Sequence, residues 1–161
     1  MALNYSSFNM TSGGFTSLAS YNTTAGMTGY SVKRDTPTTN NVVDEEVVVS
    51  VVTPAGYTPS ASTYIAVYAI GSIDGVTWPD GMAPQTSSTN ITLSVNGNNM
   101  RFLGTIPCTV ASGTFYSAPL SIAAAFGGVM PKSYAIAIQN YLPATYSVTS
   151  GTVNGTSVYY N

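Results

Sequence analysis

The segment "SYAIAIQNY", Ser133–Tyr141, alternates two kinds of side chain. The large apolar residues at 134, 136 and 138 fall on one side of an extended chain, and the alanines at 135 and 137 fall on the other. Small alanine side chains let other backbone come close to that second face. The segment therefore predicts a strand in the core of a β-protein.

The apolar block just upstream, Leu120–Met130, is too short to cross a membrane. It has about half of the roughly 20 residues that a spanning helix needs. Gly127 and Gly128 would weaken a helix there, and Lys132 follows at once. We expect an extended or short helical piece, a Gly-Gly turn and then the core strand, with Gly127, Gly128 and Pro131 setting the turn that folds the block back onto the sheet.

Similar strand patterns recur along the chain. "EEVVVSVVTP" predicts a strand from Glu45 to Val52, and its valines suggest burial on both faces. "STYIAVYAIGS" alternates in the same way and leads into the loop "DGVTWPDG". "ITLSVNGNNMRFLGTIP" predicts a β-hairpin around Asn96-Gly97, and Asn154-Gly155 predicts a second tight turn between short strands.

These short strands, separated by turn residues and without a long helical stripe, indicate the fold class. We expect an all-β protein, a β-sandwich or jelly roll of short antiparallel strands with an extended N-terminal arm. Residues 1–40 would form the arm or an irregular lead-in, and residues 41–161 the sandwich domain.

The first forty residues are rich in Ser, Thr, Asn and Gly and show no sustained period. Single aromatic residues spaced through such a segment could anchor it in grooves on adjacent subunits, with the ordering cost met on binding. On this hypothesis the interface residues are Phe8, Phe15, Tyr21 and Tyr30. The alternative is a strand-and-loop segment that covers one sheet of its own chain.

Charge is scarce in this chain. Only 6% of its 161 residues are charged, against about 25% in an ordinary soluble domain, and the formal net charge is -2. A surface with so little charge favours a subunit of a homo-oligomeric assembly. The alternative is a monomer with a polar, uncharged surface. Four basic residues are too few for a nucleic-acid footprint. No ordinary secretory signal is visible near the start.

The chain offers little for catalysis. It contains no histidine, the usual general base and a common metal ligand. Asp74 and Asp80 flank Trp78, which could stack on a sugar ring, so a glycosidase pair is conceivable, but both aspartates precede glycine as turn residues do. Cys108 reads as a small core residue, and the single cysteine excludes an internal disulfide. We expect no enzyme activity and no cofactor.

Metal and phosphate sites are not indicated either. Asp74 and Asp80 lack the dense acidic spacing of a calcium loop, and Gly127-Gly128 is not followed by the Lys-Ser/Thr of a phosphate-binding loop. Asp44-Glu45-Glu46 opens a strand, where we expect exposed carboxylates that resist unwanted edge pairing.

Three segments carry a resemblance to a known family: "YAIGSIDGVTWPDG", "MRFLGTIPC" and "YSAPLSIAAAFGGVMPKSYAIAIQN". Together they resemble small uncharacterised proteins encoded among the structural genes of tailed bacteriophages. The resemblance covers roughly residues 64–140 and is most specific over 123–131, where Met130 replaces a more usual leucine; Ser133-Tyr134 departs from a basic or aromatic pair. It implies a virion component made in the host cytoplasm and carries over no catalytic residue.

Two function classes follow. The first is a non-enzymatic virion structural protein, a capsid decoration, head-fibre or small tail component that assembles with other virion proteins through apolar and main-chain contacts. The second is a carbohydrate-binding receptor-recognition module on the virion, in which Trp78 stacks on a glycan. Neither class involves nucleic acid or a membrane.

Overall fold

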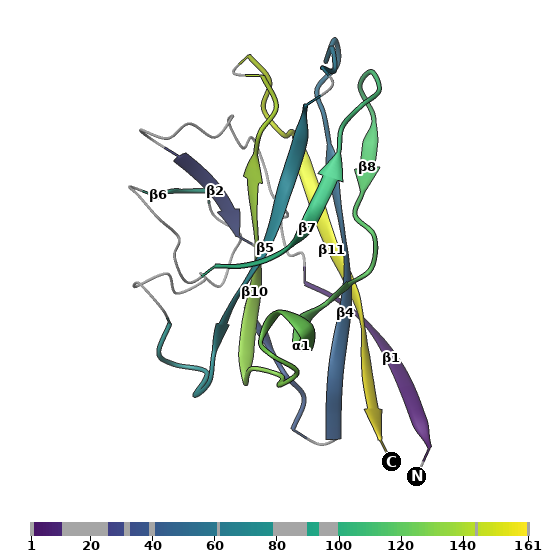
Figure 1. Cartoon of the computed structure of the whole chain (residues 1–161), viewed down its shortest axis with the longest axis vertical. Coiled ribbons are helices and arrows are strands. Elements are labelled where there is room, and N and C mark those ends of the chain that lie inside the picture. Colours follow the sequence, from purple (N-terminus) through teal and green to yellow (C-terminus); the bar gives the residue numbers. More distant parts are fainter. Residues whose placement is uncertain are drawn as a thin grey trace.

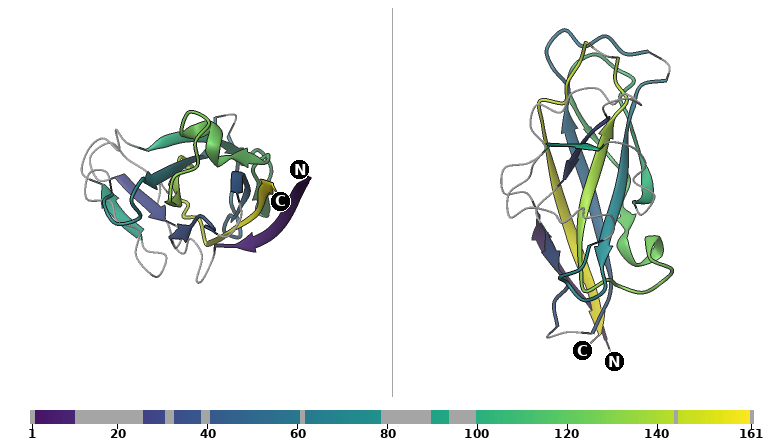
Figure 2. Two further views of the ribbon diagram at one scale, coloured as in Figure 1. Left: turned by 90° about the horizontal axis from the view of Figure 1, so that it is seen from below. Right: turned by 90° about the vertical axis from the view of Figure 1, so that its left-hand side faces the viewer.

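A computed structural model describes residues 2–10, 26–30, 33–38, 41–60, 62–78, 90–93, 100–143 and 145–160, with the backbone alone for 26–30 and 90–93 (Figure 1). The described part is a β-sandwich of two antiparallel sheets, as the sequence predicts. In end view the sheets face each other, and a short helix lies at the rim (Figure 2).

The first sheet has five strands in the order β1-β11-β4-β8, with β9 also pairing with β4. Their bounds are β1 Leu3–Asn9, β4 Asn41–Val52, β8 Thr114–Tyr116, β9 Leu120–Ser121 and β11 Ser150–Tyr160. Because Leu3 pairs with Tyr160, the two chain ends lie side by side (Figure 1).

The second sheet has six strands in the order β6-β2-β10-β5-β7, with β3 also pairing with β10. Their bounds are β2 Gly26–Tyr30, β3 Arg34–Asp35, β5 Tyr64–Ser72, β6 Asn90–Leu93, β7 Arg101–Pro107 and β10 Ser133–Asn140. The helix α1, Ile122–Ala125, connects β9 to the turn before β10.

The strand at 133–140 is the predicted core strand. Every residue of β10 is buried. Tyr134, Ile136 and Ile138 enter the main core between the sheets, while Ala135 and Ala137 pack into a second cluster with Ile70 on the outer face of the sheet. The expected division between a large apolar face and an alanine face is confirmed.

The valines of β4 are only partly as expected. Val47, Val49 and Val51 are fully buried in the core, but Val48 and Val52 are half-buried. The strand therefore has one core face, not two, because its outer face is only partly covered.

The hairpin expected around Asn96-Gly97 is wrong. β6 pairs with β2 and β7 pairs with β5, so the two runs lie at opposite ends of the strand order of their sheet. Residues 94–99, which contain Asn96-Gly97, lie outside the described residues. An Asn-Gly pair reports only local turn preference, and here tertiary pairing partners outweigh it.

The tight turn expected at Asn154-Gly155 is also wrong, because both residues lie inside the continuous strand β11. A Cβ atom at Gly155 would come within 2.3 Å of the Phe8 ring, which packs over it from the paired strand β1. Gly155 is thus required for a close approach within a strand and not for a positive φ.

Residues 1–40 contribute strands to both sheets where they are described. β1 pairs with β11, and β2 and β3 pair with β10. Asn4 and Phe8 are half-buried on one face of β1, whereas Leu3, Tyr5 and Ser7 are exposed on the other. That this segment also docks on neighbouring subunits stays a prediction.

A buried ionic cluster joins the two sheets. Glu45 on β4 is fully buried, which corrects the expectation of an exposed acidic edge: β4 lies inside its sheet, between β11 and β8. Its carboxylate accepts hydrogen bonds from Arg34 Nη2 at 2.6 Å, Tyr134 Oη at 2.6 Å and Ser157 Oγ at 2.5 Å. The Arg34 guanidinium also lies over the Phe8 ring, 3.6 Å from its centroid.

Each sheet supplies one cross-strand pair to this cluster. Ser157 lies opposite Glu45 in one sheet, and Arg34 lies opposite Tyr134 in the other. Burial, together with the negative charge of Glu45, raises the pKa of the Tyr134 hydroxyl, which therefore stays protonated and donates to the carboxylate.

Removing one member of this cluster should destabilise the fold. Glu45→Ala leaves the Arg34 charge and two hydroxyl donors without their acceptor, so we expect a loss of about 3–5 kcal/mol in the free energy of unfolding. The exposed neighbour Glu46 provides the control, because Glu46→Ala should stay within about 0.5 kcal/mol of the wild type. Urea unfolding followed by circular dichroism measures both; equal midpoints for the two variants would contradict a structural role for the cluster.

Candidate functional site

The turn after α1 is built by the two glycines. Gly127 and Gly128 have φ of 74° and 89°, a region that favours glycine. The Gly128 N–H donates to the Ala123 carbonyl at 2.8 Å and the Gly127 N–H to that of Ala124 at 3.3 Å, the pair of bonds that ends a helix in a Schellman motif. The predicted Gly-Gly turn is present.

The start of α1 is fixed from another strand. The Asp44 carboxylate on β4 accepts hydrogen bonds from Ser121 Oγ at 2.6 Å and from the Ala123 N–H at 2.9 Å. Ser121 in turn caps the helix by accepting from the Ala124 N–H at 3.0 Å. Asp44 therefore ties the block before the turn to the first sheet.

The end of the turn rests on the second sheet. A Cβ atom at Gly71 of β5 would lie 2.6 Å from the Phe126 ring and 3.2 Å from Pro131, so the turn packs directly on the strand backbone there. The Pro131 carbonyl accepts a hydrogen bond from Thr36 Oγ1 at 2.6 Å. These contacts fix the turn against the second sheet, and the outer side of the turn forms one wall of a cleft.

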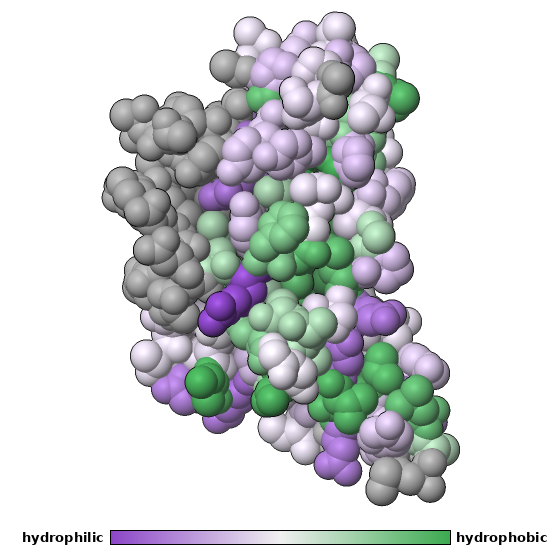
Figure 3. Space-filling view, in the orientation of Figure 1, coloured by the Kyte–Doolittle hydropathy of each residue, from purple (hydrophilic) through white to green (hydrophobic). Residues whose placement is uncertain are grey.

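This turn cleft has a volume of about 570 Å³. Its lining is mostly apolar and comes from the end of β5, the start of β7 and the turn: Ile73, Arg101, Ala125, Phe126, Gly127, Val129, Met130, Pro131 and Lys132. Figure 3 shows apolar side chains gathered on the face where α1 and β7 lie in Figure 1.

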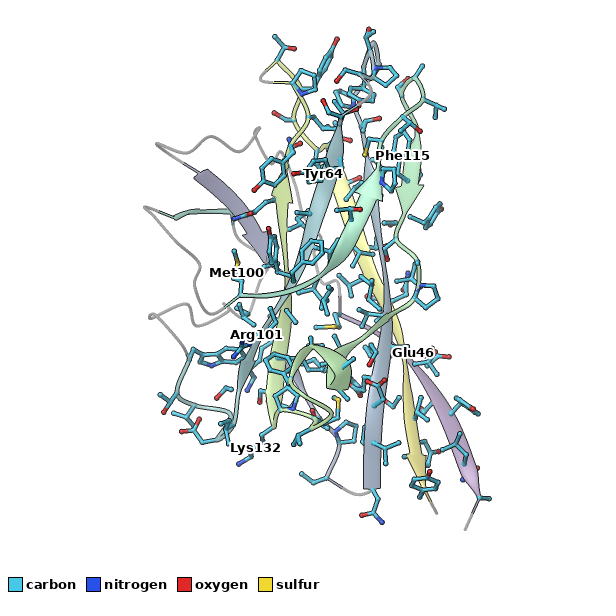
Figure 4. All side chains as sticks on the ribbon, viewed as in Figure 1. Glu46, Tyr64, Met100, Arg101, Phe115 and Lys132 are labelled. Carbon is cyan, nitrogen blue, oxygen red and sulfur yellow. The ribbon has the colours of Figure 1, made fainter. Side chains whose placement is uncertain are left out.

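Two of the four basic residues of the chain line this cleft. Figure 4 shows Arg101 and Lys132 on the same side of the molecule, with Arg101 above Lys132. Lys33 pairs with Asp35 and Arg34 with Glu45, but neither Arg101 nor Lys132 forms an ion pair with the described part of the chain. The cleft therefore combines apolar walls with two cationic side chains, of which Lys132 also lines a further hollow with Asp35 and Asp74 of its own chain. The sequence signal was weak: an isolated cation beside apolar residues in "NMRFL" and "VMPKS".

A second hollow of about 480 Å³ adjoins the first through Ile73, and Trp78 lines it. Trp78 is half-buried and packs against the cluster that contains Ala135 and Ala137. One face of this shallow hollow is thus an indole ring that a ligand can reach.

Asp74 on the rim of this hollow is committed to its own turn. It accepts hydrogen bonds from Thr77 Oγ1 and the Thr77 N–H, both at 2.7 Å, and from the Val76 N–H and Ser72 Oγ, both at 2.8 Å. The bonds from Thr77, then those from Val76 and Ser72, hold the pKa of Asp74 well below its usual range. The carboxylate is therefore ionised at neutral pH; Asp80, its suggested partner in a glycosidase pair, lies outside the described residues.

Cys108, the only cysteine of the chain, is placed as a packing residue. Cys108 is fully buried, and burial raises the pKa of its thiol to about 11. Within the described ranges, no three acidic or cysteine side chains lie together as a metal site would need. No helix in those ranges is long and apolar enough to span a membrane.

Of the four aromatic residues predicted for an interface, the structure describes the side chain of Phe8 alone, so the interface stays a prediction. The Phe8 ring packs against its own core and under Arg34. Tyr30 ends β2, where the backbone alone is described, and Phe15 and Tyr21 lie outside the described residues.

Comparison of the chain with models of known protein families, with curated proteins and with solved structures finds no match.

The positive φ angles give a direct test of the turn. Gly128→Val forces a β-branched residue to φ near 89°, and we expect it to lower the free energy of unfolding by about 1–3 kcal/mol. Gly113→Ala is the matched control, because Gly113 has an ordinary φ and space for a Cβ, the nearest other atom being 3.9 Å away. Thermal unfolding of both variants measures the difference; unchanged stability of Gly128→Val would argue against the turn.

Proposed function

We propose that this chain is a non-enzymatic structural protein of a tailed bacteriophage virion, a capsid decoration, head-fibre or small tail component. The feature that carries the assembly part of the proposal is the outer edge of β1. The phage part rests on the resemblance of roughly residues 64–140 to small uncharacterised proteins encoded among the structural genes of tailed bacteriophages.

Main-chain groups along this edge are available for pairing. The Met10 N–H donates to the Val153 carbonyl, and hydrogen-bonding direction alternates along antiparallel strands. The N–H and C=O groups of Leu3, Tyr5 and Ser7 therefore point away from β11, and β1 pairs with no other described strand. Such a row of groups can accept an additional strand.

Nothing in β1 protects this edge. Natural edge strands are usually blunted by charge, proline, a bulge or short length. The seven residues "LNYSSFN" carry no charge and no proline, and their register with β11 is unbroken. By contrast, the edge strand β7 carries Arg101 and Pro107 and a register shift, and the edge strand β8 has three residues.

Exposed apolar side chains accompany the edge. Leu3 is 44% and Tyr5 65% exposed on β1, and Tyr160 lies directly opposite Leu3. Side chains of a strand added beside β1 would pack against Leu3 and Tyr5, and its main chain would pair with that of β1, with almost no contribution from charge. The chemistry matches a subunit that assembles through apolar and main-chain contacts with copies of itself and with other virion proteins.

A proline tests the edge without touching the pairing to β11. In Ser7→Pro the lost N–H points outward, so we expect the folded chain to keep its thermal stability while its oligomers weaken. Ser7→Ala keeps the N–H and should assemble normally. Light scattering at low and high salt measures assembly, and wild-type oligomers should resist salt.

Two results would contradict the proposal: Ser7→Pro oligomers as strong as wild type, or oligomers that dissociate as salt is raised. The virion part is tested separately, by mass spectrometry of purified particles of the phage that encodes the chain. Its absence from those particles would remove the virion role.

Carbohydrate binding is the second candidate, and the accessible Trp78 ring in its hollow favours it. We expect Trp78→Ala to abolish binding on a glycan array while the fold is retained, because stacking on an indole is lost. Tyr116→Ala, which removes an aromatic ring that is 63% exposed elsewhere, should leave any glycan signal unchanged. A wild-type chain that binds no glycan eliminates this candidate.

A further inference from the structure

The turn after β5 projects a rigid apolar tip. Ile73 is 92% and Val76 81% exposed, the two highest values among the large apolar side chains of the described surface. Between them Asp74 holds the turn through its hydrogen bonds, and Gly75 takes φ of 78° and donates to Ser72 Oγ at 2.9 Å. We call Ile73, Asp74 and Val76 the knob; it is preorganised, so docking it would order few further groups.

The knob and the turn cleft are complementary. The knob presents two aliphatic side chains beside a carboxylate that hydrogen bonds hold in place, and the cleft presents apolar walls beside Arg101 and Lys132. A small amphiphilic anion would also suit the cleft, but it would leave the exposed knob unexplained. A second copy of the chain accounts for both features.

The two surfaces also adjoin each other. Ile73 belongs to the knob and lines the cleft of its own chain. In a two-fold symmetric contact each copy uses the same patch, so complementary halves of that patch must lie side by side about the axis. Adjacent knob and cleft meet this requirement.

We propose that two copies of the chain form a two-fold dimer in which the knob of each copy inserts into the turn cleft of the other, with Asp74 facing Arg101 and Lys132 of the second copy. The contact uses no residue of β1, so it stands or fails independently of strand addition at that edge.

Charge exchange between two exposed positions tests the contact. Val76→Lys places a cation at the knob, where it would meet Arg101 and Lys132 of the other copy; Val129→Glu places an anion in the cleft, where it would meet Asp74. Val129 is 69% exposed, so both changes should leave the fold intact, as thermal unfolding can verify. Each variant should bind itself at least about tenfold more weakly than wild type binds itself, because like charges meet at the contact.

Mixing the variants should restore binding. In the mixed pair, the lysine introduced at the knob of one chain would face the glutamate introduced in the cleft of the other, while the second knob and cleft are both wild type. Fluorescence anisotropy with one labelled full-length chain compares the four pairings, and β1 is identical in all of them. Val110→Lys, at a 61% exposed site in the loop between β7 and β8, is the control and should keep wild-type affinity.

The expected result is weak self-association of each variant and recovery, in the mixture, to nearly the wild-type affinity. Three results would overturn the dimer: no self-association of the wild type, self-association of either variant at wild-type strength, or a mixture no tighter than the separate variants. A dimer lost here with β1-dependent oligomers retained would leave the proposed function in place.

Discussion

One buried carboxylate constrains how the two sheets are aligned across their apolar core. Glu45 is fully buried, and its three partners come from three other strands: Arg34 from β3, Tyr134 from β10 and Ser157 from β11. A buried charge of this kind is costly unless its partners are all in place. The cluster therefore links the pairing of β3 to β10 in one sheet to that of β4 to β11 in the other, and sheet alignments that separate these residues would leave a charge unpaired. We expect the cluster to act mainly by selecting one alignment of the two sheets over others.

Phe8 extends this constraint to the edge of the molecule. Its ring lies under the Arg34 guanidinium and over Gly155, where no side chain larger than hydrogen fits. β1 is thereby held in register on β11 by an aromatic side chain of its own chain. The register of β1 with β11 is unbroken, so the groups on the opposite edge of β1 form a regular row.

Local pattern was enough to predict the sandwich, the core strand at 133–140 and the Gly-Gly turn, because alternation and positive φ are properties of neighbouring residues. It failed for Glu45, whose burial depends on partners up to 112 positions away. It failed for Asn154-Gly155 because the partner that requires Gly155 is Phe8, at the other end of the chain. Asn96-Gly97 misled because the runs on either side of it belong to opposite sheet edges. The sequence pointed to Trp78 as an individual residue. It did not predict the hollow beside Trp78 or the turn cleft, because their lining residues come from segments that are far apart in the sequence.

Scarcity of charge gives the two proposed surfaces different kinds of selectivity. Strand addition at β1 uses main-chain groups that every partner has, so its selectivity must come from the shape of the covering side chains. The turn cleft contains two of the four cations of the chain, so it distinguishes partners by charge as well as by apolar fit. A two-fold dimer formed through the knob and cleft would present two identical β1 edges. A particle surface that binds one edge would hold the second nearby at high effective concentration, which strengthens attachment without any further contact between the copies.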